Sequence, residues 1–174
     1  EIQGVSAHPG WAKDIMVNAA RLAGRFLAAL PADQSPERTS GTGGFIHPVE
    51  STATAETARV RMILRDFELA GLAAKCAILE RIVADLRAAE SRAQFKLTFT
   101  EQYRNMRYWL EHDMRPVEFA QEAMRRVGLT PKSSAIRGGT DGSNLTARGL
   151  PTPNLFCGMH EVHSQREWIS LQDM

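Results

Sequence analysis

The chain has 174 residues, of which 43% are hydrophobic and 24% are charged, a composition typical of a globular protein with a buried core. Its 21 basic and 20 acidic side chains leave a formal net charge of +1, which gives no electrostatic attraction to phosphate backbones or anionic lipids. Neither a nucleic acid nor a membrane is therefore predicted as a partner, and the longest apolar runs fall short of the roughly 18 residues that a bilayer span needs.

The first predicted elements are a short strand and an amphipathic helix. The segment IQGVSA, residues 2–7, is a candidate strand. Between residues 14 and 30 apolar side chains recur every three or four positions, and Pro31 ends the helix because it has no backbone N–H to donate. The stretch from 31 to 44 has the composition of a loop.

Two strands, a second helix and a further strand follow. GFIHPVES, residues 44–51, is a strand candidate, and in ARVRMILRDF, residues 58–67, apolar side chains alternate with arginines, which indicates one buried and one exposed face. Helical spacing of apolar residues predicts a helix over 69–90, with Lys75, Arg81, Asp85 and Glu90 largely away from its apolar side. QFKLTFTEQY, residues 94–103, alternates throughout and predicts a strand.

This order predicts an α+β fold of the ferredoxin-like type, in which a βαββαβ unit forms an antiparallel four-stranded sheet with two helices. The unit is expected to close near Tyr108. Beyond it, RPVEFAQEAMRRVG predicts a helix stopped by Gly128, IRGGTDGSNL a glycine turn that opens a possible helix, and PTPNLF an apolar strand. Residues 109–174 form no closed core alone, so we expect them to be the last part of a larger α/β domain.

The two ends of the sequence suggest a piece of a longer protein. Glu1 takes the place of an initiator methionine, and the chain stops at Met174 just after WISLQD begins what reads as a new element. We therefore expect a fragment that is cut at both ends. Its two cysteines, Cys76 and Cys157, are too few for a disulfide scaffold and are expected to be reduced.

The segment HEVHS contains two candidate metal ligands, His160 and His163. Their spacing of three residues does not fit the zincin helix, whose histidines lie four apart. A catalytic zinc ion needs at least three protein ligands, so these histidines cannot form such a site alone. Satisfied surface histidines are the alternative interpretation.

RGGTDG, residues 137–142, is a candidate binding turn. The adjacent Gly138 and Gly139 would let the backbone approach a ligand closely, Thr140 offers a hydroxyl group, and Arg137 offers a two-pronged fork for a carboxylate. An ordinary glycine turn is the alternative. In SAHPGWAK, His8 follows the first strand, and the Pro9–Gly10 turn would display its imidazole, although His8 could also be a simple polar loop residue.

Taken in order, these stretches resemble the peptidase T family, which are tripeptide aminopeptidases of the di-zinc exopeptidase clan. The resemblance covers essentially the whole chain and depends on HPGWAK, PERTSGTGGF, ILRDF, YRNMR, IRGGTDGSNL, GLPTPNLFCG and HEVHSQREW, which occur in the family's order and approximate spacing. Other clan members, such as carboxypeptidase G and succinyl-diaminopimelate desuccinylase, share parts of the pattern.

The resemblance implies a cytoplasmic enzyme that binds two zinc ions in a catalytic α/β domain and carries an inserted ferredoxin-like lid through which it forms a homodimer. Residues 1–108 would be the lid and dimerisation domain, and residues 109–174 the C-terminal portion of the catalytic domain. Small peptides would be the substrates. His163 would be the zinc ligand present in this chain, with His160 a spectator, and the other ligands and the general base would lie earlier in the full protein.

The resemblance also implies roles for the remaining candidates. His8 would stabilise the oxyanion of the reaction, reaching across from the partner subunit, and Asn105, Arg137, Gly138, Gly139 and Thr140 would hold the peptide backbone and its carboxylate. The isolated chain would then be inactive. Two other interpretations stay open: a ferredoxin-like interaction module without a catalytic role, and a zinc-binding regulatory domain, which would need more ligands than His163 and its neighbours supply.

Overall fold

The structure is a computed structural model that describes residues 1–172. The chain divides into two compact units. The first unit comprises residues 1–102 together with Ser134–Arg137, and the second comprises residues 103–133 and the chain from 138 onward. The predicted domain boundary near residue 108 stays a prediction.

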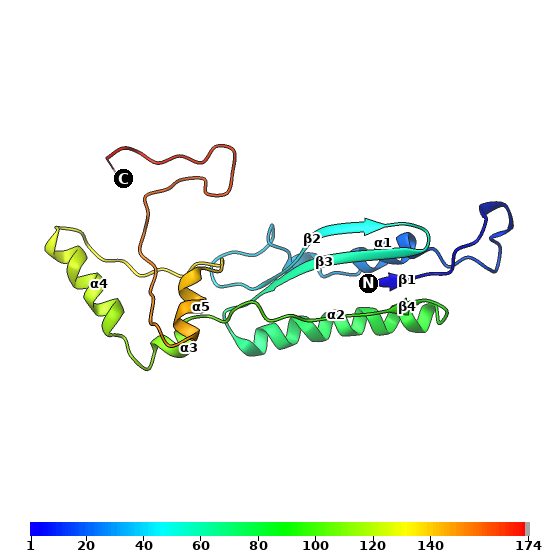
Figure 1. Cartoon of the computed structure of the whole chain (residues 1–174), viewed down its shortest axis with the longest axis horizontal. Coiled ribbons are helices and arrows are strands. Elements are labelled where there is room, and N and C mark those ends of the chain that lie inside the picture. Colours follow the sequence, from blue (N-terminus) through cyan, green and yellow to red (C-terminus); the bar gives the residue numbers. More distant parts are fainter. Residues whose placement is uncertain (173–174) are drawn as a thin grey trace. The chain divides into compact units, whose positions relative to one another are not determined.

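The first unit contains a four-stranded antiparallel sheet (Figure 1). Its strands are β1 (Ile2–Gln3), β2 (Phe45–Ala53), β3 (Thr57–Arg65) and β4 (Gln94–Phe95), arranged in the order β2-β3-β1-β4. Helix α1 (Ala19–Ala28) joins β1 to β2, and helix α2 (Leu69–Ala89) joins β3 to β4. This is the predicted βαββαβ arrangement, so the α+β fold class is confirmed.

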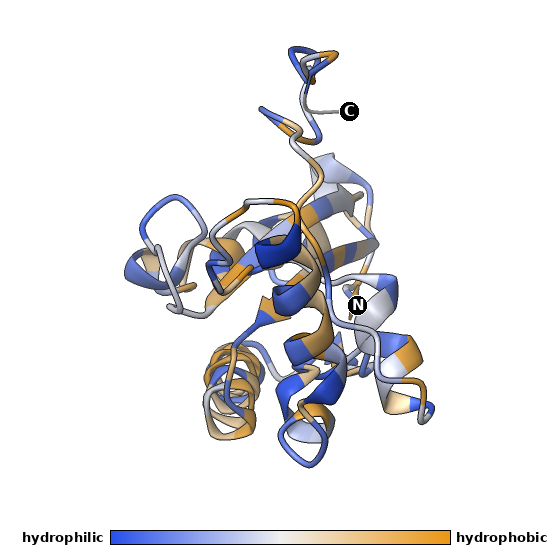
Figure 2. Ribbon diagram, turned by 90° about the vertical axis from the view of Figure 1, so that its left-hand side faces the viewer, coloured by the Kyte–Doolittle hydropathy of each residue, from blue (hydrophilic) through white to orange (hydrophobic). Residues whose placement is uncertain are grey.

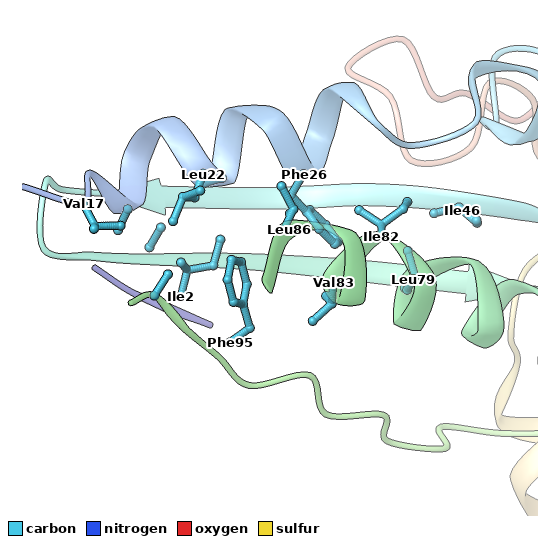
Figure 3. Close-up of a cluster of buried hydrophobic side chains, with 14 residues drawn as sticks. Ile2, Val17, Leu22, Phe26, Ile46, Leu79, Ile82, Val83, Leu86 and Phe95 are labelled. Carbon is cyan, nitrogen blue, oxygen red and sulfur yellow. The ribbon is translucent and has the colours of Figure 1, made fainter. Parts of the chain in front are cut away.

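The core of this unit lies where the two helices meet the sheet. Figure 3 shows Phe26 of α1 close to Leu86 of α2, with Leu79 and Val83 further along the same side of α2. These side chains belong to one buried cluster that also contains Phe95 of β4. Helical spacing therefore placed the apolar residues on the correct sides of α1 and α2, because each helix must bury one stripe against the sheet.

One charged residue was placed on the wrong side of α2. Lys75, which the sequence assigns to the outer face, is buried at 7% exposure. Its Nζ lies 2.6 Å from Oδ2 of Asp66, the residue after β3. The ammonium group can be buried because it has this carboxylate as a partner.

Helix α1 is shorter than the predicted helix of residues 14–30. It begins at Ala19 because the Oδ1 atom of Asn18 accepts a hydrogen bond from the backbone N–H of Arg21 at 3.1 Å and caps the first turn. Residues 6–16 instead form a loop that contains the 3₁₀ turn η1 (Pro9–Trp11). A second 3₁₀ turn, η2 (Ala32–Gln34), follows α1 in the region predicted as a loop.

The strand predicted over 94–103 is wrong beyond its first residues, since β4 ends at Phe95. The register pairs Phe95 with Ile2, and Lys96 exchanges backbone hydrogen bonds of 2.9 Å with Glu1. From Leu97 onward no strand of the described residues pairs with this segment. A strand needs a hydrogen-bonded neighbour, which alternation in sequence alone cannot supply.

The second unit is helical and leaves much apolar surface exposed. Its helices are α3 (Arg107–Leu110), α4 (Arg115–Arg126) and α5 (Asp141–Ala147), and Gly128 follows α4 with a φ of 80°, as the helix stop predicts. The predicted strand PTPNLF is irregular, and its Leu155 and Phe156 are 61% and 67% exposed. In Figure 2 the segment that leads to the C-terminal mark carries apolar residues, in orange, among polar ones.

Within residues 1–172 no helix combines the length and apolar character that crossing a bilayer requires. Cys76 and Cys157 are free thiols, and Cys157 is exposed.

Candidate functional site

His8 lies in the loop between β1 and α1 and is exposed to solvent. Its Nδ1 atom accepts a hydrogen bond of 3.1 Å from the backbone N–H of Gly10, and its ring centroid lies 4.6 Å from that of Trp11. Because Nδ1 is the acceptor in this turn, the neutral imidazole carries its proton on Nε2. His8 can therefore donate a hydrogen bond through Nε2.

Arg137 contacts a loop of the first unit. Its Nη1 and Nη2 atoms donate to the carbonyl oxygen and the Oγ1 atom of Thr39, at 2.7 and 2.5 Å, and its Cζ atom lies 4.7 Å from the ring centroid of Phe45. The Nε atom is buried without a hydrogen-bond partner among the described residues. Arg137 thus contacts the segment PERTSGTGGF within the first unit, and Thr39 occupies the two guanidinium donors that a carboxylate would use.

Gly138, Gly139 and Thr140 belong to the second unit. A Cβ atom on Gly139 would collide with the ring of Tyr103, so the glycine permits a close approach there. Thr140 is the N-cap residue of α5, and its Oγ1 accepts a hydrogen bond of 3.1 Å from Nδ2 of Asn154. Both the turn and the hydroxyl group are held by neighbouring side chains.

Asn105 precedes α3 in the same unit, and its Oδ1 atom accepts a hydrogen bond of 3.0 Å from the backbone N–H of Arg107. Helix α3 contacts α5, and Tyr103 lies against Gly139. The segments YRNMR and RGGTDG, far apart in the sequence, are therefore neighbours.

His163 is exposed and has a φ of 63°, in the left-handed region. Its backbone N–H donates to Oε2 of Glu167 at 2.7 Å. His160 stacks on Trp168 with ring centroids 4.3 Å apart and planes 14° apart, and the two residues also exchange backbone hydrogen bonds. His160 thus closes the short loop that carries His163.

The described residues do not supply a complete metal site. Within residues 1–172 no group of three or more His, Cys, Asp or Glu side chains is arranged to hold a metal ion. His163 alone does not fit a zinc ion, which takes four ligands in most protein sites.

The predicted site residues are divided between the two units. His8 and Arg137 lie in the first, whereas Asn105, Gly138 to Thr140 and His163 lie in the second. Thr39 was not predicted as the partner of Arg137, although it stands in one of the segments that carry the family resemblance. Arg92 contacts the loop of His8 but was not predicted either, because it lies in no recognisable motif.

Relatives of this chain cover almost all of it. It is 46% identical over 171 residues to peptidase T of Aeromonas hydrophila, and this match covers 98% of this chain and 42% of that protein. It is 38% identical over 174 residues to peptidase T of Latilactobacillus sakei, again over 42% of that protein. The chain thus spans less than half the length of the curated relatives it matches, and the resemblance to peptidase T is confirmed.

A solved structure has a similar fold. The crystal structure of aminopeptidase PepT from Bacillus cereus ATCC 10987 matches with a TM-score of 0.65 at 21% identity, over 99% of this chain and 46% of that one. Residues 1–94 match the peptidase dimerisation domain, and they include β1, β2, β3, helices α1 and α2 and the first residue of β4. The chain therefore belongs to the peptidase dimerisation domain family.

Proposed function

We propose that the protein carrying this chain is a cytoplasmic zinc-dependent aminopeptidase that releases the N-terminal residue of tripeptides and acts as a homodimer. The supporting observation is the identity of 38% to 46% to peptidase T over nearly the whole chain. In this proposal residues 1–108 form the lid and dimerisation domain, and residues 109–174 form the C-terminal portion of the catalytic domain.

His8 is proposed to bind the oxyanion that develops on the peptide carbonyl, acting from the partner subunit. The hydrogen bond from Gly10 to Nδ1 supports this role because it leaves Nε2 as a hydrogen-bond donor. His8 and Trp11 are both exposed, so the ring is accessible to a substrate.

The peptide backbone and its carboxylate are proposed to be held by Asn105, Arg137, Gly138, Gly139 and Thr140. The contact between Tyr103 and Gly139 supports a shared role for the two segments that contain these residues. A guanidinium group binds a carboxylate more strongly than it binds neutral oxygens, so a peptide carboxylate could replace Thr39 on Arg137.

His163 is proposed to provide one zinc ligand, and the remaining ligands and the general base would come from parts of the protein outside this chain. The bond between its backbone N–H and Glu167 holds the loop that presents the imidazole. When bound, zinc would polarise the peptide carbonyl and activate water.

The proposal is tested by assaying the complete protein with a tripeptide, the same peptide with an acetylated N-terminus, and a dipeptide. We expect zinc-dependent release of the first residue from the free tripeptide only, and loss of activity after chelation that zinc restores. Cleavage of the acetylated peptide at an equal rate, or full activity after the metal has been removed, would contradict an aminopeptidase of this class. Upstream sequence without a His-x-Asp motif and a Glu-Glu pair would also contradict it.

A second candidate is an interaction module without a catalytic role. It is favoured by the match of residues 1–94 to a dimerisation domain and by the absence of a metal-binding cluster within residues 1–172. In that case the complete protein would dimerise but would not hydrolyse any of the three peptides.

Another di-zinc exopeptidase of the same clan would instead hydrolyse substrates of a different length.

A further inference from the structure

The loop that carries His8 projects from the end of the sheet. Figure 1 shows it in dark blue, extending beyond β1 and away from the rest of the first unit. At its base Val5 and Val17 exchange two backbone hydrogen bonds of 2.9 Å, which fix where the loop leaves and rejoins the sheet. Those bonds do not determine the course of the residues between them, so the direction of His8 depends on further contacts.

Arg92 provides such a contact from a distant part of the sequence. Its Nη1 atom donates to the carbonyl oxygens of Asp14 and Ile15, at 3.1 and 3.3 Å. Asp14 has a φ of 61°, a conformation that non-glycine residues adopt rarely and at a cost in free energy. A guanidinium group that holds both carbonyl oxygens favours this turn over its alternatives.

Arg92 is itself fixed by Glu90. Its Nε and Nη2 atoms donate to the two carboxylate oxygens of Glu90, each at 2.9 Å, and its backbone N–H donates to Oε1 at 3.2 Å. This hydrogen bonding lowers the pKa of Glu90 and raises that of Arg92, so both groups stay charged. Ala93, the next residue, is buried in the core, so the pair of Arg92 and Glu90 is anchored to the packed part of the unit.

From these contacts we propose that Arg92 is a positioning residue: held by Glu90, it fixes the Asp14–Ile15 arm of the loop and so the direction in which His8 is presented. The catalytic consequence rests on the proposed role of His8. Arginine suits the task because one planar group can bind a carboxylate with two donors and still offer Nη1 to two carbonyl oxygens. Lysine, with a single nitrogen, cannot maintain the same geometry.

The test uses the complete enzyme and four variants: Arg92→Gln, His8→Ala, the double variant, and Arg81→Gln as a control. The control, Arg81→Gln, removes the same positive charge from an exposed position of α2. We expect Arg92→Gln to lower kcat about tenfold, with KM and zinc content unchanged, because a catalytic donor that is displaced slightly loses much of its effect. Added to His8→Ala, it should lower kcat no further, since both changes act through the same group.

Two further measurements cover folding and the loop itself. Arg92→Lys restores the positive charge but should recover little of the lost kcat. The thermal unfolding temperatures of Arg92→Gln and Arg92→Lys should stay close to that of the Arg81→Gln control. Hydrogen exchange should accelerate at the amides of residues 12–16 in Arg92→Gln but not in Arg81→Gln, whatever the role of His8.

The outcomes separate this inference from the proposed function. An equal loss of kcat with and without His8, or unchanged exchange in the loop, would overturn the positioning role. The positioning role would also be overturned if Arg92→Gln kept the wild-type kcat while His8→Ala lowered it. If His8→Ala itself left kcat unchanged, the proposed role of His8 would fail and the catalytic claim for Arg92 with it, while the exchange data would still decide whether Arg92 braces the loop.

Discussion

The local turn around His8 decides which of its ring nitrogens can donate a hydrogen bond. The Pro9–Gly10 turn was readable from the sequence because proline and glycine favour such geometry. It predicted a displayed imidazole, and the loop is exposed as expected. The contact of Arg137 with Thr39 was not readable, because 98 residues separate the two in the chain and only packing of the first unit brings them together.

Removal of the His8 hydrogen-bond donor has a predictable effect on turnover. In the complete enzyme His8→Ala should lower kcat by roughly tenfold to a thousandfold with zinc content unchanged, since a lost oxyanion donor costs about this much. Steady-state kinetics and metal analysis of the purified variant measure both quantities.

His8→Asn is the matched control for the turn. Its side-chain oxygen can still accept the hydrogen bond from Gly10, as asparagine does at N-cap positions, but it has no atom in the place of Nε2. It should therefore lose as much activity as His8→Ala. Wild-type turnover in either variant would remove His8 from the mechanism.

Strand β3 and helix α2 are tied together by a buried ion pair at their junction. The side chains of Asp66 and Lys75 are 14% and 9% exposed, and a Cβ atom on Gly44 or Gly71 would collide with one or both of them. Burial alone would raise the pKa of Asp66, but the hydrogen bond from Lys75, the backbone N–H of Glu68 and the charge of Lys75 lower it below its ordinary range. Periodicity predicted both elements but not this pair, because it treats every charge as exposed.

We predict that Lys75→Met destabilises the chain by about 3–5 kcal/mol, because it leaves the Asp66 carboxylate buried without its partner. Urea denaturation at neutral pH measures the loss. The double variant Lys75→Met, Asp66→Leu should recover much of it, and a loss in the double variant as large as in the single one would contradict the explanation.

The pair also has a predictable pH dependence. Since the pKa of Asp66 is lowered on folding, the unfolded chain binds its proton first as the pH falls. The stability that the pair contributes is thus complete at a pH above the pKa of Asp66 in the unfolded chain, which is about 4. It is lost as the pH falls from there through the lower pKa of the folded chain. The double variant should lack this component of the acid transition.

The two units differ in how much of their apolar surface they bury. The first has a continuous core, whereas Leu110 is the one large apolar side chain buried in the described part of the second, which exposes Phe119, Val127, Leu155 and Phe156. An exposed surface of this kind is typical of a segment that packs against more protein. The relatives are more than twice as long as this chain, which agrees with that interpretation.

We therefore predict that the isolated chain, supplied with zinc and a tripeptide, releases no product above background, since one imidazole cannot hold a catalytic zinc ion. Chromatographic detection of the free amino acid measures this. His163→Ala in the same chain is the control, and turnover clearly above that variant would contradict the prediction.

The α+β class, the order of the elements in the sheet unit and the family motifs could all be read from the sequence, because periodicity, turn residues and short motifs are local properties. The length of β4, the burial of Lys75, the partner of Arg137 and the contact of Arg92 with the His8 loop became visible in the folded chain alone. Each of these depends on which distant backbone or charge lies opposite a residue, and that is set by packing.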